Sequence, residues 1–265
     1  MKYKRRLGQH ILHDDVLQRI LIYASPTSKD IVFEIGTGPG NLTRILCEKS
    51  GRVISYELDE RMHELAKNNL SGVNNLDIIL GDAFAQNPKF TILVSNLPYN
   101  YSLRFIEWII KQRFKKAIVT LQKEFVEKLI AKPGSERYRG ISVVAQANLS
   151  ITLLEEISPE NFDPIPHVSS IIISLKPKTK RMDLKALKFV KILFSFRGRK
   201  LSNALKKIIV ENDGKYEEIV QNIEPLLLST RVEKLEVYEV MKIVEIITMN
   251  ELKNSGKEHL SASRR

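Results

Sequence analysis

The amino-acid sequence predicts an α/β fold, with a Rossmann-like, mostly parallel sheet and a smaller all-helical C-terminal domain. Short apolar strands alternate with amphipathic helical segments between residues 31 and 131, which is typical of a doubly wound sheet. A glycine-rich turn joins the first of these strands to a helix. After residue 184 the apolar residues recur only at helical spacing.

The elements of the predicted sheet follow in a regular order. A first helix, capped by Asp14 or Asp15, is expected to bury Val16, Leu17 and Ile20. Strands and helices then alternate, with strands at 31–35, 53–57, 76–80, 91–96 and 116–122 and helices at 41–49, 60–69, 102–113 and 123–131. Because such strands run parallel, their carboxyl ends meet at one edge, where ligands bind in open α/β sheets.

The second half of the chain changes character near Pro177. A helical segment at 141–147 precedes two strands, 151–157 and 168–175, which are expected to form an antiparallel pair at one sheet edge. The basic run 176–181 indicates a linker, and helices are expected at 184–194, 201–209, 216–224 and 237–249. We therefore predict two domains, residues 1–177 and residues 178–265.

Composition limits the classes of partner that the chain is expected to bind. Its 265 residues carry a net charge of +11 with a pI near 9.6, and basic domains of this kind attract polyanions. A Lys- and Glu-rich thermophilic surface explains many of the charges but not their positive excess. Cys47 is the single cysteine and the histidines lack metal-ligand spacing, so no metal is expected. No apolar run has the length of a signal core or a membrane span, which predicts a cytoplasmic protein.

Acidic residues and glycines cluster where the first three strands end. Gly36, Gly38 and Gly40 follow strand 31–35 in the pattern Glu-x-Gly-x-Gly-x-Gly, which differs from the dinucleotide fingerprint. Glu34 in that strand would repel a phosphate and favour a cationic ligand. Glu57 and Asp82 follow the next two strands. Each acid alone is as well explained as a helix cap or a solvated residue, but three of them at successive strand ends indicate a ligand site.

The tetrapeptide Asn96-Leu97-Pro98-Tyr99 ends the strand 91–96. The Asn96 amide oxygen and the Leu97 carbonyl are two acceptors, Pro98 restricts the backbone, and Tyr99 offers a face for stacking. These groups suit a flat ring with an exocyclic amino group, such as adenine. In isolation the same residues are typical of a strand-ending turn.

Taken in order, these motifs resemble those of S-adenosylmethionine-dependent adenine-N6 methyltransferases. Leu7-Gly8-Gln9-His10-Ile11-Leu12 is similar to the signature of one branch, the small-subunit ribosomal RNA adenine dimethyltransferases. The segment 162–170 resembles the Phe-x-Pro-x-Pro-x-Val-x-Ser loop of that family, and 196–205 resembles its basic helix start. The resemblance extends from Lys4 to the C-terminal helices.

The resemblance implies the roles of individual residues. Residues of the S-adenosylmethionine site would be Gln9, His10, Leu12, Glu34, Gly36, Gly38, Glu57, Leu58, Asp82, Ala83 and Asn96. The target adenine would be held by Asn96, Leu97, Tyr99 and Phe162. RNA contacts would come from Lys4, Arg5, Arg6, Arg139, His167, Arg197, Arg199 and Lys200. The implied activity is dimethylation of adenosines, two of them adjacent, in a hairpin loop near the 3′ end of small-subunit rRNA, on an immature small subunit and by a monomer.

Two departures and three alternatives qualify this prediction. Tyr138-Arg139-Gly140 stands where the family commonly has Tyr-Gly-Arg, and His167 stands where it usually has Lys; both concern RNA contacts more than the chemistry. A resistance-type methylase of large-subunit rRNA shares the tetrapeptide, although Leu97 and the signature at 7–12 favour the small-subunit branch. A DNA adenine methyltransferase is less favoured, because no target-recognition insertion is evident. A non-catalytic RNA-binding assembly factor is the alternative from a different class.

Overall fold

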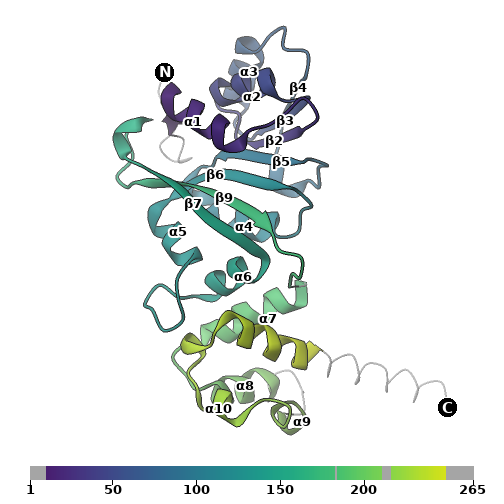
Figure 1. The fold of residues 1–265 in the computed structure, drawn as a ribbon, viewed down its shortest axis with the longest axis vertical. Coiled ribbons are helices and arrows are strands. Elements are labelled where there is room, and N and C mark those ends of the chain that lie inside the picture. The colour runs from purple at the N-terminus through teal and green to yellow at the C-terminus, as the bar shows by residue number, and fades with distance from the viewer. Residues whose placement is uncertain (1–9, 183, 211–215, 249–265) are drawn as a thin grey trace, which may run out of the picture. The chain divides into compact units, whose positions relative to one another are not determined.

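The computed structural model divides the chain into two compact units (Figure 1). The first comprises Met1–Val126 and Leu149–Thr179, and the second comprises Glu127–Asn148 and Lys180–Arg265. Within them the structure describes residues 10–182, 184–210 and 216–248. The contacts predicted for Gln9 and for Lys4, Arg5 and Arg6 therefore lie outside the described residues, and the functional division at residue 177 stays a prediction.

A seven-stranded sheet forms the centre of the first unit, in the order β4-β3-β2-β5-β6-β9-β7. Five strands run parallel: β2 (Ile31–Ile35), β3 (Arg52–Glu57), β4 (Leu76–Leu80), β5 (Ile92–Asn96) and β6 (Lys116–Gln122). β9 (Ser170–Pro177) is antiparallel to β6 and to β7 (Leu149–Ile157). The predicted parallel sheet and its antiparallel pair are confirmed, with β9 lying between β6 and the edge strand β7.

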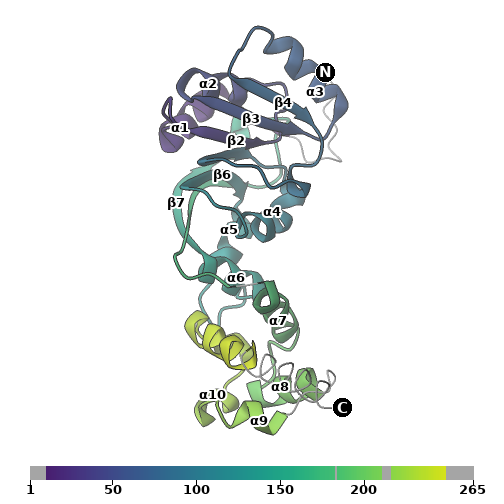
Figure 2. The ribbon, with the colours of Figure 1, turned by 90° about the vertical axis from the view of Figure 1, so that its right-hand side faces the viewer.

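Helices bury apolar side chains on both faces of this sheet. α1 (Asp14–Ala24) and α2 (Asn41–Lys49) lie on the same side of the sheet (Figure 2). They share one core cluster with strand residues such as Val32, Val94 and Ile118. On the other face the ring of Phe33 stacks on Phe90 and on Trp108 of α4 (Ser102–Ile109), with centroid distances of 5.2 and 5.7 Å. The other two helices of this unit are α3 (Glu60–Asn69) and α5 (Lys123–Leu129), of which α5 continues into the second unit.

The cap of α1 and the end of α4 differ from the prediction. His13 is the N-cap of α1, so Asp14 and Asp15 lie in the first turn, where acids favour the helix dipole and Asp15 pairs with Arg19 at 2.7 Å. α4 ends at Ile109 instead of residue 113. The amide of Lys111 bonds to a carbonyl only three residues back, which tightens the chain into a turn before β6.

Two short strands link the start of the described chain to a distant loop. β1 (Ile11–Leu12) pairs antiparallel with β8 (Phe162–Asp163), and Leu12 lies opposite Phe162. The His13 amide also donates to the Asn161 carbonyl at 3.0 Å. Two segments that the sequence analysis assigned to one site are thus held side by side by backbone hydrogen bonds.

The second unit is helical in its described part. Its helices are α6 (Gly140–Asn148), α7 (Leu184–Ser195), α8 (Leu201–Val210), α9 (Tyr216–Val220), α10 (Pro225–Ser229) and a helix at 237–248. The predicted helix 216–224 ends at Val220, because the chain turns before Pro225 opens α10. The Tyr138 side chain is buried, its hydroxyl donates to the Leu235 carbonyl at 3.0 Å, and its ring meets Phe194 edge-on.

Gly140 lies where α6 approaches α7 within the same unit. A Cβ at position 140 would lie 3.3 Å from the Cβ of Phe194, which is tighter than most Cβ contacts. Phe194 would have to shift by a few tenths of an ångström to accommodate a larger residue, so the packing favours glycine here.

Phe33→Ala should lower the free energy of unfolding by about 3–5 kcal/mol, because it removes a fully buried ring from the aromatic stack. Ile22→Ala changes an exposed side chain of α1 and should stay within about 0.5 kcal/mol of the unmodified protein. Urea unfolding followed by tryptophan fluorescence measures both. Equal effects of the two variants would contradict the role given to the stack.

Candidate active site

The loop between β2 and α2 adopts a backbone shape that favours glycine. Gly36, Gly38 and Gly40 have φ angles of 85°, 54° and 96°, in the left-handed region that other residues rarely occupy. A Cβ on Gly40 would also lie only 2.7 Å from the Cδ1 atom of Leu70. The loop is tied to the next strand, since the Gly36 amide donates to the Tyr56 carbonyl at 2.8 Å.

Glu34, in the strand that precedes this loop, supports the loop through hydrogen bonds. Its side chain is completely buried in β2, and its Oε2 accepts hydrogen bonds from Thr43 of α2 at 2.7 Å and from Ser55 of β3 at 2.6 Å. The Ser55 hydroxyl in turn bonds to Thr37 in the loop at 2.6 Å. Burial raises the pKa of Glu34 to about 8, with a smaller contribution from the nearby Glu57. At neutral pH this carboxyl group is therefore predominantly protonated.

The Glu57 carboxylate closes the loop from the other side. Its Oε2 accepts from the Gly38 amide at 2.8 Å, and its Oε1 accepts from the amides of Leu58 and Asp59, both at 2.9 Å. Three backbone donors thus converge on one side chain that is only 5% exposed. A carboxylate has about four lone-pair positions, so Glu57 keeps acceptor capacity toward a ligand.

Two cavities meet at Gly36, Glu57 and Pro98. The first, which we call the nucleoside cavity, has a volume of about 470 Å³ and lies along the ends of β2, β3 and β4. Its walls are partly apolar and partly acidic; they include Leu58, Asp59, Glu60, Arg61, Asp82, Ala83, Phe84 and Tyr101. A volume of this order suits a small organic ligand.

Asp82 belongs to a local network in the nucleoside cavity. One oxygen accepts from the Phe84 amide at 3.0 Å, and the other pairs with Arg104 at 2.6 Å. The Arg104 guanidinium also lies over the Phe84 ring, 5.0 Å from its centroid. The carboxylate, Arg104 and the ring are therefore positioned as one group.

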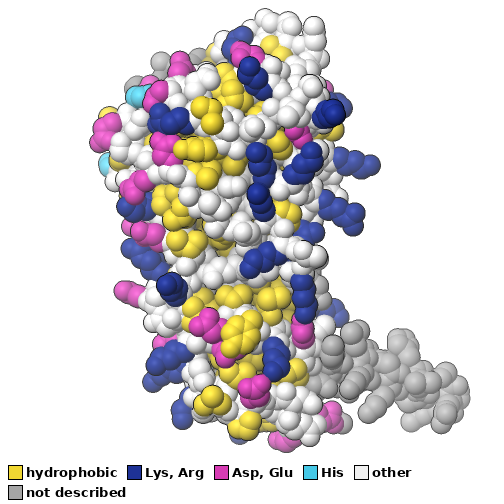
Figure 3. All heavy atoms as spheres, in the orientation of Figure 1, with side chains coloured by type: hydrophobic (Ala, Val, Ile, Leu, Met, Phe, Trp, Pro, Cys, Tyr) yellow, Lys and Arg dark blue, Asp and Glu magenta, His cyan; other side chains and the backbone are white. Residues whose placement is uncertain are grey.

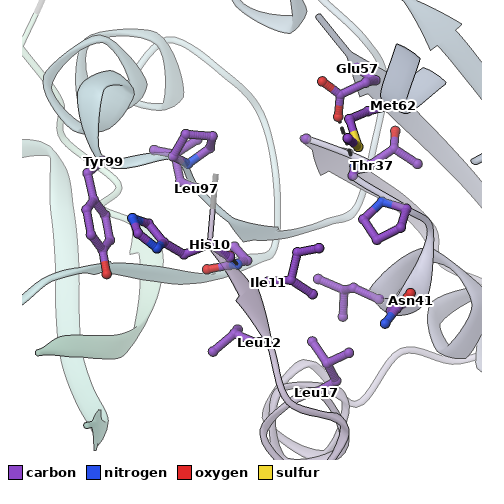
Figure 4. Close-up of a pocket in the computed structure, with 16 residues that line it drawn as sticks. His10, Ile11, Leu12, Leu17, Thr37, Asn41, Glu57, Met62, Leu97 and Tyr99 are labelled. Atoms are coloured by element: carbon purple, nitrogen blue, oxygen red, sulfur yellow. Dashed lines mark hydrogen bonds between the residues drawn. The ribbon is translucent and has the colours of Figure 1, made fainter. Parts of the chain in front are cut away.

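The second cavity, which we call the reaction pocket, lies at the end of β5 (Figure 4). His10, Leu12, Asn96, Leu97 and Tyr99 line it together with glycine-loop residues. Figure 4 shows the Tyr99 and His10 rings facing each other on the side of the pocket away from Glu57. Their centroids are 5.4 Å apart, with planes 28° from parallel.

Hydrogen bonds fix the groups around these two rings. The Asn96 side-chain amide donates to the His10 carbonyl at 2.7 Å, and His10 Nδ1 lies 2.6 Å from the Pro164 carbonyl. The Tyr99 hydroxyl bonds to Ser170 at 2.8 Å, and burial raises the pKa of Tyr99. Phe162 is buried and meets the His10 ring edge-on at 6.4 Å. The imidazole ring of His10 therefore lies between the rings of Tyr99 and Phe162.

The structure brings most of the predicted ligand-site residues together. The two cavities are lined by His10, Leu12, Gly36, Gly38, Glu57, Leu58, Asp82, Ala83, Asn96, Leu97 and Tyr99. Phe162 lies behind His10 and is not among the lining residues. Glu34 also lines neither cavity, because its carboxyl group is engaged beneath the glycine loop.

The residues predicted to contact RNA have different surroundings. His167 is exposed in the first unit. In the second unit Arg139 donates to backbone carbonyls of Glu136 and Tyr138, and Arg197 pairs with Glu233 at 3.0 Å. Arg199 and Lys200 are exposed; the Arg199 guanidinium lies 5.7 Å from the centroid of the Phe196 ring. In the predicted Arg197–Lys200 cluster, Arg199 and Lys200 are therefore the charges that face solvent and have no carboxylate partner among the described residues.

Several lining residues were missed by the sequence reasoning. Phe84 and Tyr101 line the nucleoside cavity, while Asn41 and Met62 line the reaction pocket. Phe84 follows Asp82 by two positions and Tyr101 follows Tyr99 by two, so their closeness to recognised motifs was an available signal. Met62 carried no such signal, since its position on α3 resembles that of an ordinary core residue.

Within the described ranges, no three or more His, Cys, Asp or Glu side chains are grouped as metal ligands. In the same part of the chain, none of the helices is both long and apolar enough to span a bilayer.

Comparisons with known proteins agree with this geometry. The family model of the ribosomal RNA adenine dimethylases matches residues 1–249. A ribosomal RNA small subunit methyltransferase A of Thermotoga maritima is 36% identical over 249 residues, covering 92% of this chain and 85% of the relative. The crystal structure of a dimethyladenosine transferase from Plasmodium falciparum superposes with a TM-score of 0.79 at 27% identity, covering 91% of this chain and 98% of the other.

A further solved structure shows how widely the fold is shared. A 23S rRNA methyltransferase superposes with a TM-score of 0.64 at 22% identity, covering 89% of this chain and 98% of the other. At this identity the likeness concerns the fold alone.

The sheet, the glycine loop and the strand-end acids define an S-adenosylmethionine-dependent methyltransferase. Within that class, the chain belongs to the ribosomal RNA adenine dimethylase family. The predicted recognition, fold class and enzyme class are thereby confirmed.

The raised pKa of Glu34 predicts a specific dependence of stability on pH. Between its ordinary value of 4.5 and about 8, the unfolded chain loses the Glu34 proton while the folded protein keeps it. Unfolding then releases a proton, so this residue makes stability fall with rising pH, by up to about 1.4 kcal/mol per pH unit.

Glu34→Gln should remove that contribution, because an amide does not titrate. Denaturant unfolding between pH 5 and 8 measures the difference from the unmodified protein, and Glu48→Gln, at an exposed position of α2, is the matched control. If both variants followed the pH dependence of the unmodified protein, Glu34 would be ionised in the fold.

Proposed function

We propose that this chain transfers methyl groups from S-adenosylmethionine to N6 of adenosines in small-subunit rRNA, forming dimethyladenosine. The observation that carries the proposal is the reaction pocket, where Asn96, Leu97 and Tyr99 meet a cavity of nucleoside size at Glu57. Family membership and the names of relatives that act on small-subunit rRNA support the substrate class.

The residues of the nucleoside cavity fit the proposed cofactor. Glu57, with its spare acceptor capacity, would bind the ribose hydroxyls, and Asp82 would accept from the adenine amino group. Leu58, 54% exposed although apolar, would cover the purine ring together with Ala83. When bound, S-adenosylmethionine supplies an electrophilic methyl group. The acidic lining suits its positive charge.

The reaction pocket would act on the target adenine by positioning it. The Asn96 side-chain oxygen and the Leu97 carbonyl would accept hydrogen bonds from the N6 amino group. These hydrogen bonds would favour a pyramidal nitrogen, whose lone pair is less delocalised into the ring and so more nucleophilic. Tyr99 would stack on the base, with Phe162 behind. The His10 ring now occupies this slot, stacked on Tyr99 and edge-on to Phe162, so it would have to turn away for the base to enter. The nitrogen becomes strongly acidic once it has received the methyl group, so its proton can then leave to water, and catalysis by orientation and electrostatics needs no acid–base pair.

The finer features of the substrate belong to the same proposal. Because the base has to leave its stack to reach Tyr99, an adenine in a loop costs less to present than one in a duplex. This cost favours a hairpin loop, and the family resemblance further implies a loop near the 3′ end of small-subunit rRNA, two adjacent adenosines and an immature subunit. A role in subunit biogenesis in the cytoplasm follows from that substrate.

Incubation of unmodified small-subunit particles with labelled S-adenosylmethionine, followed by mapping of the modified bases, tests the function. Dimethyladenosine in the loop near the 3′ end is expected. Label confined to large-subunit rRNA would identify the resistance-type reaction instead, and no label in either RNA would favour the non-catalytic assembly factor.

Asn96→Ala should lower the rate of methyl transfer by about 100-fold or more, because one of the two acceptors for the amino group is removed. Cofactor binding, measured by calorimetry, should stay within a few-fold. Asn222→Ala removes an amide from the second unit, where it bonds to a helix carbonyl, and should leave the rate unchanged. A fully active Asn96→Ala enzyme would contradict the assignment.

Arg199 and Lys200, both exposed in the second unit, lead to a separate expectation. Arg199→Gln combined with Lys200→Gln should weaken RNA binding and make its salt dependence shallower, by about 0.7–0.9 in slope for each phosphate that is no longer neutralised. Arg197→Gln should act mainly on stability, because it leaves Glu233 without its partner. Filter binding across salt concentrations and thermal unfolding distinguish the two effects; an unchanged slope in the double variant would rule out the phosphate contacts.

A further inference from the structure

A group of lysines lies at the end of the sheet opposite to the reaction pocket. Lys116 opens β6, Lys115 precedes it, and Lys176 lies near the end of β9. These three side chains, here called the basic edge, line a surface cavity of about 410 Å³ together with Ser25, Asp30 and Ile92. Figure 3 shows Lys and Arg side chains gathering beside the end of β9, with few acidic side chains among them.

Two lysines of the basic edge face each other across neighbouring strands. Ala117 pairs with Leu175 in the antiparallel register of β6 and β9, so Lys116 and Lys176 occupy the next opposed positions. Like charges directly opposed in a sheet are destabilising. Burial lowers the pKa of Lys116, and the charge of Lys176 lowers it further, while the negative charge of Asp30 acts in the opposite direction with a smaller effect. The fold therefore holds these charges together at a cost.

Neighbouring groups relieve this cost only in part. Asp30 pairs with Lys115 at 3.1 Å, and its carboxylate also accepts from the hydroxyls of Thr27 and Thr91. The Lys116 ammonium donates to the Tyr23 carbonyl at 3.2 Å, which is an uncharged partner. Among the described residues no carboxylate pairs with Lys116 or Lys176. A bound anion would supply the missing counter-charge.

We propose that the basic edge binds the phosphate backbone of a second rRNA segment, separate from the segment that carries the target adenine. This inference rests on the proposed function and names a further contact with the same substrate particle. Lysine suits this task, because it meets phosphates as a point charge and needs no defined bidentate geometry.

The register of the sheet shows why one short loop does not reach both places. Ile92 pairs with Lys116 and Asn96 pairs with Thr120, so four residues separate the two levels, or about 13 Å along the strands. The reaction pocket lies at the carboxyl end of β5, whereas the basic edge lies where β5 and β6 begin. A hairpin loop seated in the pocket points away from the lysines, while a folded particle offers additional RNA segments.

The central experiment removes the two opposed charges. Lys116→Gln with Lys176→Gln should weaken binding to unmodified small-subunit particles by about tenfold at low salt and reduce the salt slope by about 1.5, as expected when two phosphates are no longer neutralised. The matched control, Arg52→Gln with Lys67→Gln, removes two charges from the same unit that already pair with Asp77 and Glu64. It should change the affinity by less than twofold.

A short RNA hairpin separates this inference from the proposed function. If the unmodified enzyme methylates neither particles nor hairpin, the proposed function fails. If it methylates them and the double variant keeps the particle affinity and slope of the unmodified enzyme, the basic edge has no RNA contact and the inference is overturned. If the double variant lost equal affinity for the hairpin and for the particle, the lysines would contact the target segment itself, which also overturns the inference. The expected result is a loss of affinity for the particle alone.

One further variant distinguishes binding from a structural role. Lys176→Glu places an opposite charge beside Lys116, so thermal stability should stay equal or rise while particle affinity falls more than in Lys176→Gln. A loss of stability that accounts for the loss of affinity would assign the lysines to the fold and overturn the inference. Vesicles of anionic lipid serve as the alternative polyanion, and charge-dependent binding to them with unchanged particle binding would overturn it as well.

Discussion

Three backbone amides converge on the Glu57 carboxylate, and the site depends on this interaction. One of them, from Gly38, comes from the loop after β2, while the other two follow β3. The side chain thereby joins two neighbouring strand ends and sets the shape of the glycine loop. Because Glu57 also borders both cavities, the groups proposed to hold cofactor and base are positioned by the same few hydrogen bonds.

Glu34 complements this arrangement without contacting a ligand. Two hydroxyl groups donate to its buried carboxyl, and the chain through Ser55 reaches Thr37 in the loop. A buried carboxylate would be costly so close to Glu57, and the raised pKa avoids that cost by protonation. The two acids therefore divide the work: Glu34 supports the loop as a neutral group, and Glu57 faces the cavities.

Parallel strands explain why the sheet presents different chemistry at its two ends. The carboxyl ends of β2, β3, β4 and β5 bring the glycine loop, the acids and the tetrapeptide to one edge. At the other end the starts of β5 and β6 meet the end of β9, where lysines accumulate. In the second unit, the exposed Arg199 and Lys200 lie in the loop between α7 and α8, and buried contacts such as that between Tyr138 and Leu235 order the surrounding elements. Within the first unit, substrate recognition is therefore proposed to involve the basic edge, at the end of the sheet opposite to the reaction pocket.

The sequence by itself determined the fold class, the strand-end motifs and the family, because these depend on local patterns: apolar alternation, glycines at positive φ, and the tetrapeptide after β5. It also predicted the convergence of Glu57, Asp82 and Asn96, which follows from parallel strand order alone. Only the tertiary structure decided which charges are available. Glu34 is neutralised by burial, Arg197 is paired with Glu233, and Lys116 faces Lys176 across the sheet. Each outcome depends on contacts that the fold makes between separate segments, and local sequence patterns do not indicate which residues meet in this way.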